Sequence, residues 1–335
     1  RGYQARIVYD ALGNVVQEID ALGNSVHHEY DANGNRTATT DPMGNTTTFV
    51  YDALNRQTSS TNALGQTVTY TFDDNGNRLT ETNHLGHTIT YTYDAMNRLL
   101  TTTDHLGHTV TNTYDELGRT ATVTDPRNNQ TVFDYDELGQ LVKVTDAASG
   151  EVTALYYELG NRTSLTDTRG NVTTYSYDTL YRLVSETDPL GNAETMTYDS
   201  VGNVLTVNNA DSTTTFSYDK KNQLKTVTYP NAVTVTYTYD ANGNPTSVVD
   251  AMGTTSYAYN QLDQVASITD PFGMTVGYGY NPNGSRSATQ YPGYKTVTYQ
   301  YDSLNRLATI NDWGGVTTSY AYDDAGRLVQ TTMGN

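Results

Sequence analysis

Two pairs of histidines are spaced as metal ligands could be. His84 and His87 flank a Leu-Gly pair, and His105 and His108 repeat the same string 21 residues later. Histidines at the two ends of a tight turn can converge, and neighbouring turns of a sheet lie about 10 Å apart. Four imidazoles in that arrangement would suit zinc or copper. The alternative is one duplicated repeat whose histidines are all exposed, and the sequence leaves both readings open.

Strings of aspartate, asparagine and glycine suggest calcium at first sight. One of them runs from Asp31 to Asn35 as Asp-Ala-Asn-Gly-Asn. Calcium requires six to eight oxygen ligands, and an EF-hand loop places a glutamate at its twelfth position. Pro42 occupies that position here. These strings are therefore interpreted as turns.

The most frequent constellation is an aromatic residue followed by aspartate. Clear cases are Tyr9-Asp10, Tyr30-Asp31, Tyr51-Asp52, Tyr93-Asp94, Tyr135-Asp136, Tyr177-Asp178, Tyr239-Asp240, Tyr301-Asp302 and Tyr322-Asp323. A carboxylate can act as a general acid or base, but an active site is singular and this aspartate recurs throughout the chain. We expect it to accept backbone N–H bonds in turns. The sequence carries no P-loop, nucleophile elbow or dinucleotide fingerprint, so we predict no catalysis and no cofactor.

These pairs mark a repeat that covers residues 1–335. The aromatic positions are Tyr9, Tyr30, Tyr51, Phe72, Tyr93, Tyr114, Tyr135, Tyr157, Tyr177, Tyr198, Tyr218, Tyr239, Tyr259, Tyr280, Tyr301 and Tyr322. Successive spacings are 21 residues in eleven cases, 20 in three and 22 in one. Such a period indicates a tandem array, here about sixteen units of 20–22 residues, in place of separate globular domains.

Each unit is predicted to be a β-hairpin. The segment Thr67–Phe72 alternates threonine with valine or an aromatic residue, which places the two kinds on opposite faces of a strand. We expect the aromatic face to be the less exposed one. Stacked tyrosines could also bind sugars, but cross-strand aromatic pairs that hold the sheet together are the simpler reading.

Turns close both ends of each hairpin. Glycine or asparagine stands four residues after most of the aromatic positions, where a left-handed backbone is expected. Tyr181 fits this position poorly. A second turn has the form found at Asp188–Asn192, Asp-Pro-Leu-Gly-Asn, in which aspartate caps, proline presets φ and glycine reverses the chain.

Composition limits the class of protein. Only 36% of the residues are hydrophobic, yet 29 are tyrosine, which suits a sheet with large solvated faces. The net charge of −18 repels phosphate backbones and argues against nucleic acid as a partner. No cysteine is present, so disulfides and thiolate metal sites are excluded. No apolar run is long enough for a membrane span.

Sixteen hairpins predict an all-β chain with one continuous antiparallel sheet. About 32 strands at about 4.8 Å each would make a ribbon roughly 150 Å long. Long sheets twist and curl, and a ring of that circumference would be about 50 Å wide, too wide for side chains to fill. We therefore expect the sheet to spiral into a hollow shell or tube.

The units resemble the YD repeat of the Rhs (rearrangement hotspot) family. That repeat reads Tyr-x-Tyr-Asp-x-x-Gly-Arg-Leu followed by Thr-Asp-Pro-x-Gly-Asn, and the segments 175–183 and 320–328 stand close to it. The family includes bacterial polymorphic toxins, shell components of insecticidal toxin complexes, wall-associated proteins and teneurins. The resemblance implies a β-shell, secreted or at the cell surface and most often bacterial, which in the toxin members encloses a C-terminal toxic domain.

Two roles follow from the resemblance. In the first, the chain is a wall segment of a longer protein, and its partners are other repeats, flanking plug or core segments and an enclosed toxin. In the second, it belongs to a structural or adhesive tube or fibre without cargo. Toxin members carry a core segment rich in Arg-Tyr-Tyr and Asp-Pro that caps the shell and releases the toxin. Residues 1–335 contain no such segment and no toxin domain.

Overall fold

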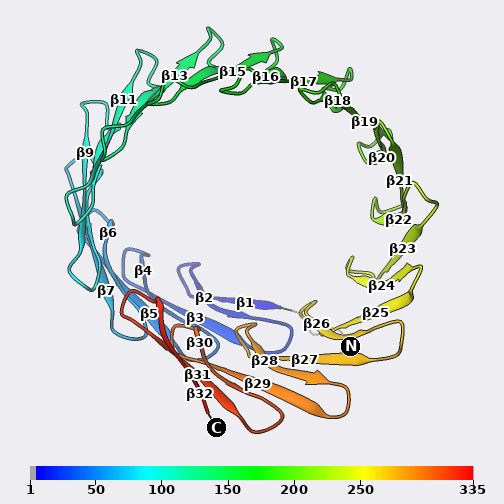
Figure 1. Cartoon of the computed structure of the whole chain (residues 1–335). Coiled ribbons are helices and arrows are strands. Elements are labelled where there is room, and N and C mark those ends of the chain that lie inside the picture. The colour runs from blue at the N-terminus through cyan, green and yellow to red at the C-terminus, as the bar shows by residue number, and fades with distance from the viewer. Residues whose placement is uncertain (1–4, 335) are drawn as a thin grey trace. The chain divides into compact units, whose positions relative to one another are not determined.

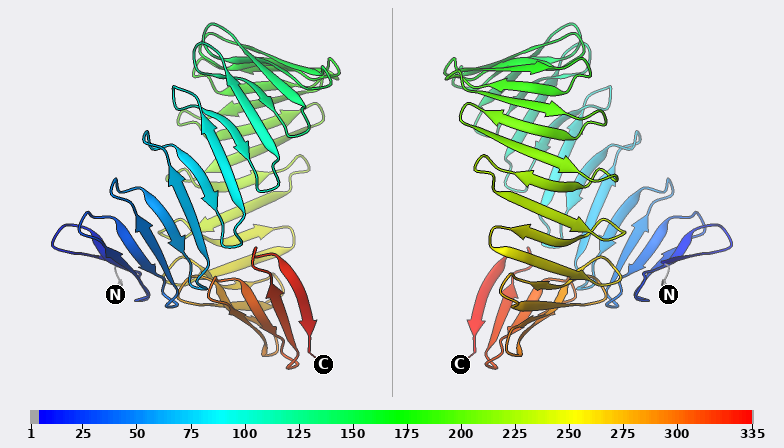
Figure 2. Two further views of the ribbon diagram at one scale, coloured as in Figure 1. Left: turned by 90° about the vertical axis from the view of Figure 1, so that its left-hand side faces the viewer. Right: turned by 90° about the vertical axis from the view of Figure 1, so that its right-hand side faces the viewer.

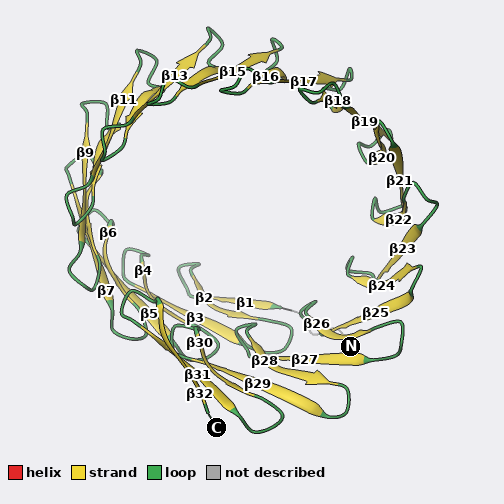
Figure 3. Cartoon of the chain, viewed as in Figure 1, coloured by secondary structure: helices red, strands yellow, loops and turns green. Residues whose placement is uncertain are grey.

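The computed structural model of the protein describes residues 5–334. These residues form 32 strands and no helix (Figure 3). All 32 strands belong to one sheet, and the pairing is antiparallel wherever its register is described. The prediction of an all-β chain made of tandem hairpins is therefore confirmed.

The chain divides into two compact units. Unit 1 comprises residues 5–89, 239–247 and 253–334, and unit 2 comprises residues 90–238 and 248–252. Strands β9 (Thr88–Tyr93), β23 (Thr234–Tyr239) and β24 (Pro245–Asp250) contain boundaries between the units.

Unit 1 contains two runs of strands. The first run is β1 (Arg6–Tyr9), β2 (Val15–Ile19), β3 (Ser25–Tyr30), β4 (Arg36–Thr40), β5 (Thr46–Tyr51), β6 (Gln57–Thr61), β7 (Thr67–Phe72) and β8 (Arg78–Thr82). The second is β25 (Gly253–Tyr259), β26 (Val265–Thr269), β27 (Thr275–Tyr280), β28 (Arg286–Tyr291), β29 (Lys295–Tyr301), β30 (Leu307–Asn311), β31 (Thr317–Tyr322) and β32 (Leu328–Met333). In each run, consecutive strands pair in chain order (Figure 1).

Unit 2 repeats the same arrangement. Its strands are β10 (Leu99–Thr103), β11 (Thr109–Tyr114), β12 (Thr120–Thr124), β13 (Gln130–Tyr135), β14 (Leu141–Thr145), β15 (Glu151–Tyr156), β16 (Arg162–Thr166), β17 (Val172–Tyr177), β18 (Leu183–Thr187), β19 (Ala193–Tyr198), β20 (Val204–Asn209), β21 (Ser212–Tyr218) and β22 (Leu224–Thr228). Strands lie side by side within a unit, and turns join them at both ends (Figure 2). Each odd-numbered strand ends at the aromatic residue of its repeat.

The alternation in the sequence sets which side chains are exposed. In β7, Val68, Tyr70 and Phe72 are half-buried, whereas Thr69 and Thr71 are exposed. The prediction that the aromatic face is the less exposed one is confirmed for this strand. Among the described residues, the only buried hydrophobic side chains are Ala38, Ala154, Val227 and Val297, and none of them is completely shielded from solvent. The sheet therefore has no conventional core, and its strands rely on pairing with their neighbours.

Threonine contributes to that pairing. The hydroxyls of Thr40 and Thr46 lie 2.8 Å apart across the β4–β5 pair, and those of Thr61 and Thr67 lie 2.8 Å apart across β6–β7. Cross-strand threonine pairs stabilise a sheet by a few tenths of a kcal/mol to about 1 kcal/mol each. The abundance of threonine in this chain follows from this use.

Candidate functional site

The repeated Tyr-Asp turn is the recurrent polar construction of the chain. In the turn after β11, the backbone N–H groups of Leu117 and Arg119 donate to Oδ1 of Asp115 at 3.0 and 2.9 Å. Arg119 Nε donates to Oδ2 of the same carboxylate at 2.6 Å. Gly118 lies at φ +82°, and the strand register shifts by a β-bulge before Tyr114. Both oxygens of the carboxylate thus accept hydrogen bonds from residues of its own turn.

The predicted repeat residues occupy equivalent places. Tyr9, Tyr30, Tyr51, Tyr93, Tyr135, Tyr177, Tyr239, Tyr301 and Tyr322 end the first strand of their hairpins. Asp10, Asp31, Asp52, Asp94, Asp136, Asp178, Asp240, Asp302 and Asp323 open the following turns, where each backbone N–H donates to the carbonyl four residues on. These positions and bonds agree with the expected place of each pair in its turn, and the purely structural role of the pairs stays a prediction.

In several units, an arginine of one hairpin stacks on an aromatic residue of the next hairpin. This contact was not predicted from the sequence. Arg119 stacks over the ring of Tyr135 at 4.6 Å, and its Nη1 donates to the carbonyl of Asp136 at 3.1 Å. The same stacking joins Arg56 to Phe72, Arg98 to Tyr114, Arg182 to Tyr198 and Arg306 to Tyr322. The available signal was arginine recurring five residues after the aromatic position.

The tyrosine hydroxyl has a partner that was also missed. Tyr135 donates to the carbonyl of Thr120 at 3.1 Å, fifteen residues upstream. The same bond is made by Tyr30, Tyr51, Tyr114, Tyr156, Tyr177, Tyr198, Tyr280, Tyr301 and Tyr322. A buried or half-buried tyrosine hydroxyl needs such a partner. The repeat therefore prefers tyrosine to phenylalanine, although Phe72 shows that the ring alone is tolerated.

The structure corrects one position of the repeat. The sequence was interpreted with Tyr157 as the aromatic residue of its unit, but Tyr156 ends β15 and donates to the carbonyl of Leu141 at 2.9 Å. Tyr157 opens the turn at the place where most other units have aspartate, and its carbonyl accepts from the N–H of Gly160 at 2.9 Å. With Tyr156 in place, Gly160 falls four residues later, as in the other units.

Hydrogen bonds lower the pKa of several turn aspartates, Asp94 and Asp31 among them. For Asp94, the backbone N–H of Arg98 is the largest cause, followed by the Arg98 guanidinium. For Asp31, the side-chain amide of Asn35 comes first and its backbone N–H second. A general acid at neutral pH requires a raised carboxyl pKa, so these carboxylates are tuned in the opposite direction. Their chemistry is that of fixed hydrogen-bond acceptors.

The left-handed turn position gives a local test. Gly76 lies at φ +90°, and a Cβ added there would meet no atom within 4 Å. We expect Gly76→Ala to lower the free energy of unfolding by about 1–2 kcal/mol through backbone strain alone, measured by denaturant titration. Gly277→Ala is the matched control, because that glycine has no positive φ and only ordinary contacts. An equal loss of stability in both variants would contradict the idea that the left-handed backbone at Gly76 causes the loss.

The four histidines of the predicted metal site lie in the turns after β8 and β10. Nδ1 of His108 is 2.9 Å from Oδ2 of Asp104, within its own turn. His84 and His87 belong to unit 1, and His105 and His108 to unit 2. Among the described residues, no group of three or more His, Asp or Glu could hold a metal ion. Metal binding at these turns stays a prediction.

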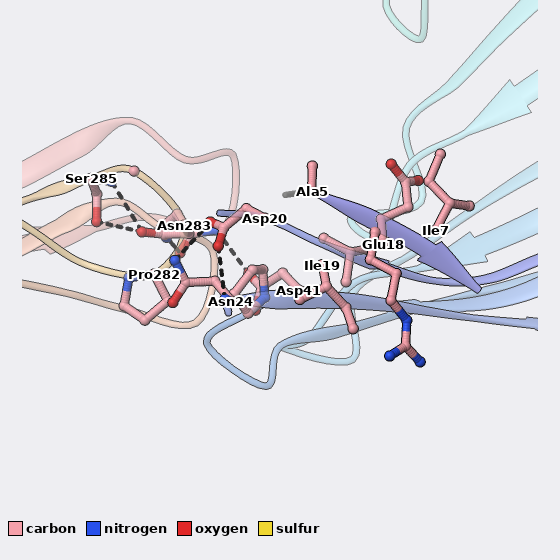
Figure 4. A pocket seen from close by; sticks show the side chains of 15 residues that line it. Ala5, Ile7, Glu18, Ile19, Asp20, Asn24, Asp41, Pro282, Asn283 and Ser285 are labelled. Carbon is pink, nitrogen blue, oxygen red and sulfur yellow. Dashed lines mark hydrogen bonds between the residues drawn. The ribbon is translucent and has the colours of Figure 1, made fainter. Parts of the chain in front are cut away.

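A cavity of about 890 Å³ lies within unit 1 (Figure 4). It is lined by Glu18, Asp20 and Asp41 from the first hairpins and by Pro282 and Asn283 from the turn after β27. Beside it, Asn305 Nδ2 donates to Oδ2 of Asp41 at 3.2 Å, a bond between residues 264 positions apart. Turns from the first run of strands thus meet turns from the second run. Ala5, the first described residue, also lines this cavity. We assign no ligand to the cavity.

Comparison with known proteins shows the same repeat. The family model described as RHS Repeat matches residues 9–46, 30–67, 51–86, 72–109, 114–152, 156–193, 198–234, 218–255, 239–275 and 301–335. Together these matches cover most of the chain. No curated protein sequence matches it.

Solved structures share its fold. A crystal structure of TcdB2-TccC3 without the hypervariable C-terminal region has 15% sequence identity and a TM-score of 0.82, covering 98% of this chain and 22% of that one. The TcdB2-TccC3-Cdc42 crystal structure has 16% identity and a TM-score of 0.79, covering 99% of this chain and 21% of that one. This chain thus spans about a fifth of their length. Because the RHS Repeat model matches along most of its length, the chain belongs to the RHS repeat family.

Proposed function

We propose that this chain is a wall segment of an Rhs-repeat β-shell that encloses a C-terminal toxin or other cargo. The observation that carries the proposal is the uniform sheet of hairpins, whose fold matches a TcdB2-TccC3 structure over 98% of the chain at a TM-score of 0.82. A structural scaffold follows directly from that fold. Enclosure of cargo rests on the expectation that a longer array of the same units curls around a hollow space.

A non-catalytic role is supported by the chemistry of the turns. The most abundant carboxylates, those of the Tyr-Asp turns, are occupied by backbone N–H groups and by arginine or asparagine side chains. An active site is singular, whereas this aspartate recurs in most units of the chain. The scaffold role therefore needs no cofactor, and the repeats serve to hold one another in register.

Partners and location extend the same proposal. We expect other repeats of the parent chain and plug or core segments to contact the sheet edges, with the enclosed domain as a further partner. The net charge of −18 disfavours nucleic acid. In the described part of the chain, no helix has the length and apolar character that crossing a membrane requires. A toxin-type shell would act outside the producing cell, secreted or at its surface.

Electron microscopy of the intact parent protein tests the proposal. We expect a discrete hollow particle with density inside it. An empty extended tube or fibre would overturn the encapsulating role and favour a structural or adhesive surface protein instead. Limited proteolysis gives a second reading, because an enclosed domain should resist cleavage until the shell is unfolded.

A further inference from the structure

Two adjacent turns of unit 2 depart from the rule that the other units follow. In the turn after β15, Tyr157 stands where most units place aspartate. In the turn after β17, Tyr181 stands at the left-handed position with φ 60°. The remaining fifteen units place glycine, asparagine or, at Asp263, aspartate at this position. Both departures place a large aromatic side chain in turns on the same side of the sheet, where the odd-numbered strands end.

The conformation of Tyr181 is strained. A side chain larger than that of glycine or asparagine is disfavoured in the left-handed region because Cβ crowds the following carbonyl. Strained residues persist where the surrounding structure maintains them, and they concentrate at binding sites. Asparagine would satisfy the turn without this strain, as it does at Asn55 and Asn97. Tyr294 shares this backbone conformation at φ 62°, so what distinguishes Tyr181 is the cavity that its side chain lines.

The two turns enclose an open cavity of about 430 Å³. It is lined by Tyr157, Glu158, Leu159, Tyr177, Asp178 and Tyr181. The rings of Tyr157 and Tyr177 meet edge to face, with centroids 6.2 Å apart and planes at 77°. Tyr177 is fixed by its hydroxyl, which donates to the carbonyl of Arg162 at 2.9 Å. Tyr157 and Tyr181 remain 50% and 53% exposed, so their rings are accessible to a ligand.

The charges at the cavity favour a cation. Asp178 is compensated, because Arg182 Nε donates to its Oδ2 at 2.7 Å. The Arg182 guanidinium in turn lies over Tyr198 and does not line the cavity. Glu158 has no hydrogen bond or ion pair with any residue that the structure describes. A cation in the cavity would lie among three tyrosine rings and beside one uncompensated carboxylate.

We propose that Tyr157, Tyr177 and Tyr181 form an aromatic cage that binds a quaternary ammonium group. A primary ammonium requires several hydrogen-bond acceptors, whereas the cavity offers one free carboxylate. A trimethylammonium group needs none and is attracted by aromatic faces within about 6 Å. This chemistry occurs in free small molecules and in phosphocholine lipid headgroups. The site does not depend on whether the shell encloses cargo.

The test is a titration of the full chain with choline, followed by NMR of the tyrosine resonances and by calorimetry. The neutral isostere 3,3-dimethyl-1-butanol has the same shape without the charge, and we expect it to bind about tenfold more weakly. Tyr157→Asp and Tyr181→Asn restore the residues of the repeat and should each weaken choline binding about tenfold. Equal binding of choline and its isostere, or unchanged binding in both variants, would overturn the proposal.

Folding cannot obscure the result. Tyr181→Asn removes backbone strain, so its melting temperature should rise while its affinity falls. Tyr294→Asn is the matched control, because Tyr294 also has φ 62° but lies outside the cavity. This control should raise the melting temperature and leave choline binding unchanged. Loss of choline binding in the control would contradict the assignment of the site.

Vesicles distinguish the two sources of the ligand. Sedimentation of the full chain with phosphatidylcholine vesicles, reversed by choline and absent with phosphatidylglycerol, assigns the cage to a lipid headgroup. Choline binding without sedimentation assigns it to a free small molecule. Absence of both overturns the proposal.

Discussion

Replacing Tyr135 with alanine is expected to lower the free energy of local unfolding around β13 by about 3 kcal/mol. The ring is stacked under Arg119 at 4.6 Å, and the hydroxyl bonds to the carbonyl of Thr120. Truncation removes both contacts and leaves the guanidinium without its aromatic partner. Tyr239 holds the equivalent position in its hairpin, and we expect a comparable effect of Tyr239→Ala. Hydrogen exchange followed by mass spectrometry measures both changes.

The loss should reach the neighbouring hairpins. In a repeat array, stability is the sum of contributions within units and between nearest neighbours, and Tyr135 contributes to both. Tyr135→Phe is the matched control, because it keeps the ring and loses one hydrogen bond, at a cost of about 1 kcal/mol. Unchanged protection of the hairpins β11–β12 and β15–β16 in the alanine variant would contradict this account.

Acidification below about pH 4 is expected to destabilise the whole array. The pKa is lowered in the native state for the turn aspartates Asp10, Asp20, Asp31, Asp41, Asp52, Asp73, Asp94, Asp104, Asp115, Asp125, Asp167, Asp178, Asp188, Asp199, Asp240, Asp302 and Asp323. An ordinary aspartate has a pKa near 3.8. The unfolded chain therefore binds protons first as the pH falls, which draws the equilibrium towards unfolding.

The direction in which the melting temperature changes with pH distinguishes the loss of turn hydrogen bonds from the effect of net charge. Protonation reduces the net charge of −18 and the repulsion that goes with it, which alone would stabilise the protein. We expect the loss of turn hydrogen bonds to dominate, so the melting temperature should fall between pH 5 and pH 3 at constant ionic strength. A melting temperature that stays constant or rises over that range would show that the carboxylates contribute little.

A single turn provides the control for the acid effect. Asp94→Asn keeps an oxygen that can accept the backbone N–H groups of Met96 and Arg98, and the chain itself uses asparagine in this way at Asn62. The variant should lose part of its stability at neutral pH, because the Arg98 ion pair is absent. Its melting temperature should depend less on pH than that of the unchanged protein.

Local features could be predicted from the residues because they depend on contacts within one turn or one strand. Alternation along Thr67–Phe72 is a property of extended backbone, and the capping by Asp188 and the reversal at Gly191 involve five consecutive residues. Tyr181 shows the limit of this reasoning. Its residue type argued against a left-handed turn, yet the repeat geometry around it imposes one.

Contacts across strands could not be predicted in the same way. The choice between Tyr156 and Tyr157 depends on which of them pairs with Arg162 across the hairpin. The stacking of Arg119 on Tyr135 joins residues sixteen positions apart, and its geometry follows from how one hairpin lies beside the next. Adjacent turns bring Tyr157 and Tyr181 to one cavity by the same pairing.

The amino-acid sequence alone established the repeat, the all-β class and the aromatic position of every unit except that of Tyr156. It could do so because a period of about 21 residues indicates that the same local structure recurs along the chain. Three-dimensional packing was needed to show which neighbouring units exchange hydrogen bonds, which ring each arginine covers and where tyrosines converge. Those outcomes depend on the register between strands, and register is set by the summed pairing of many residues.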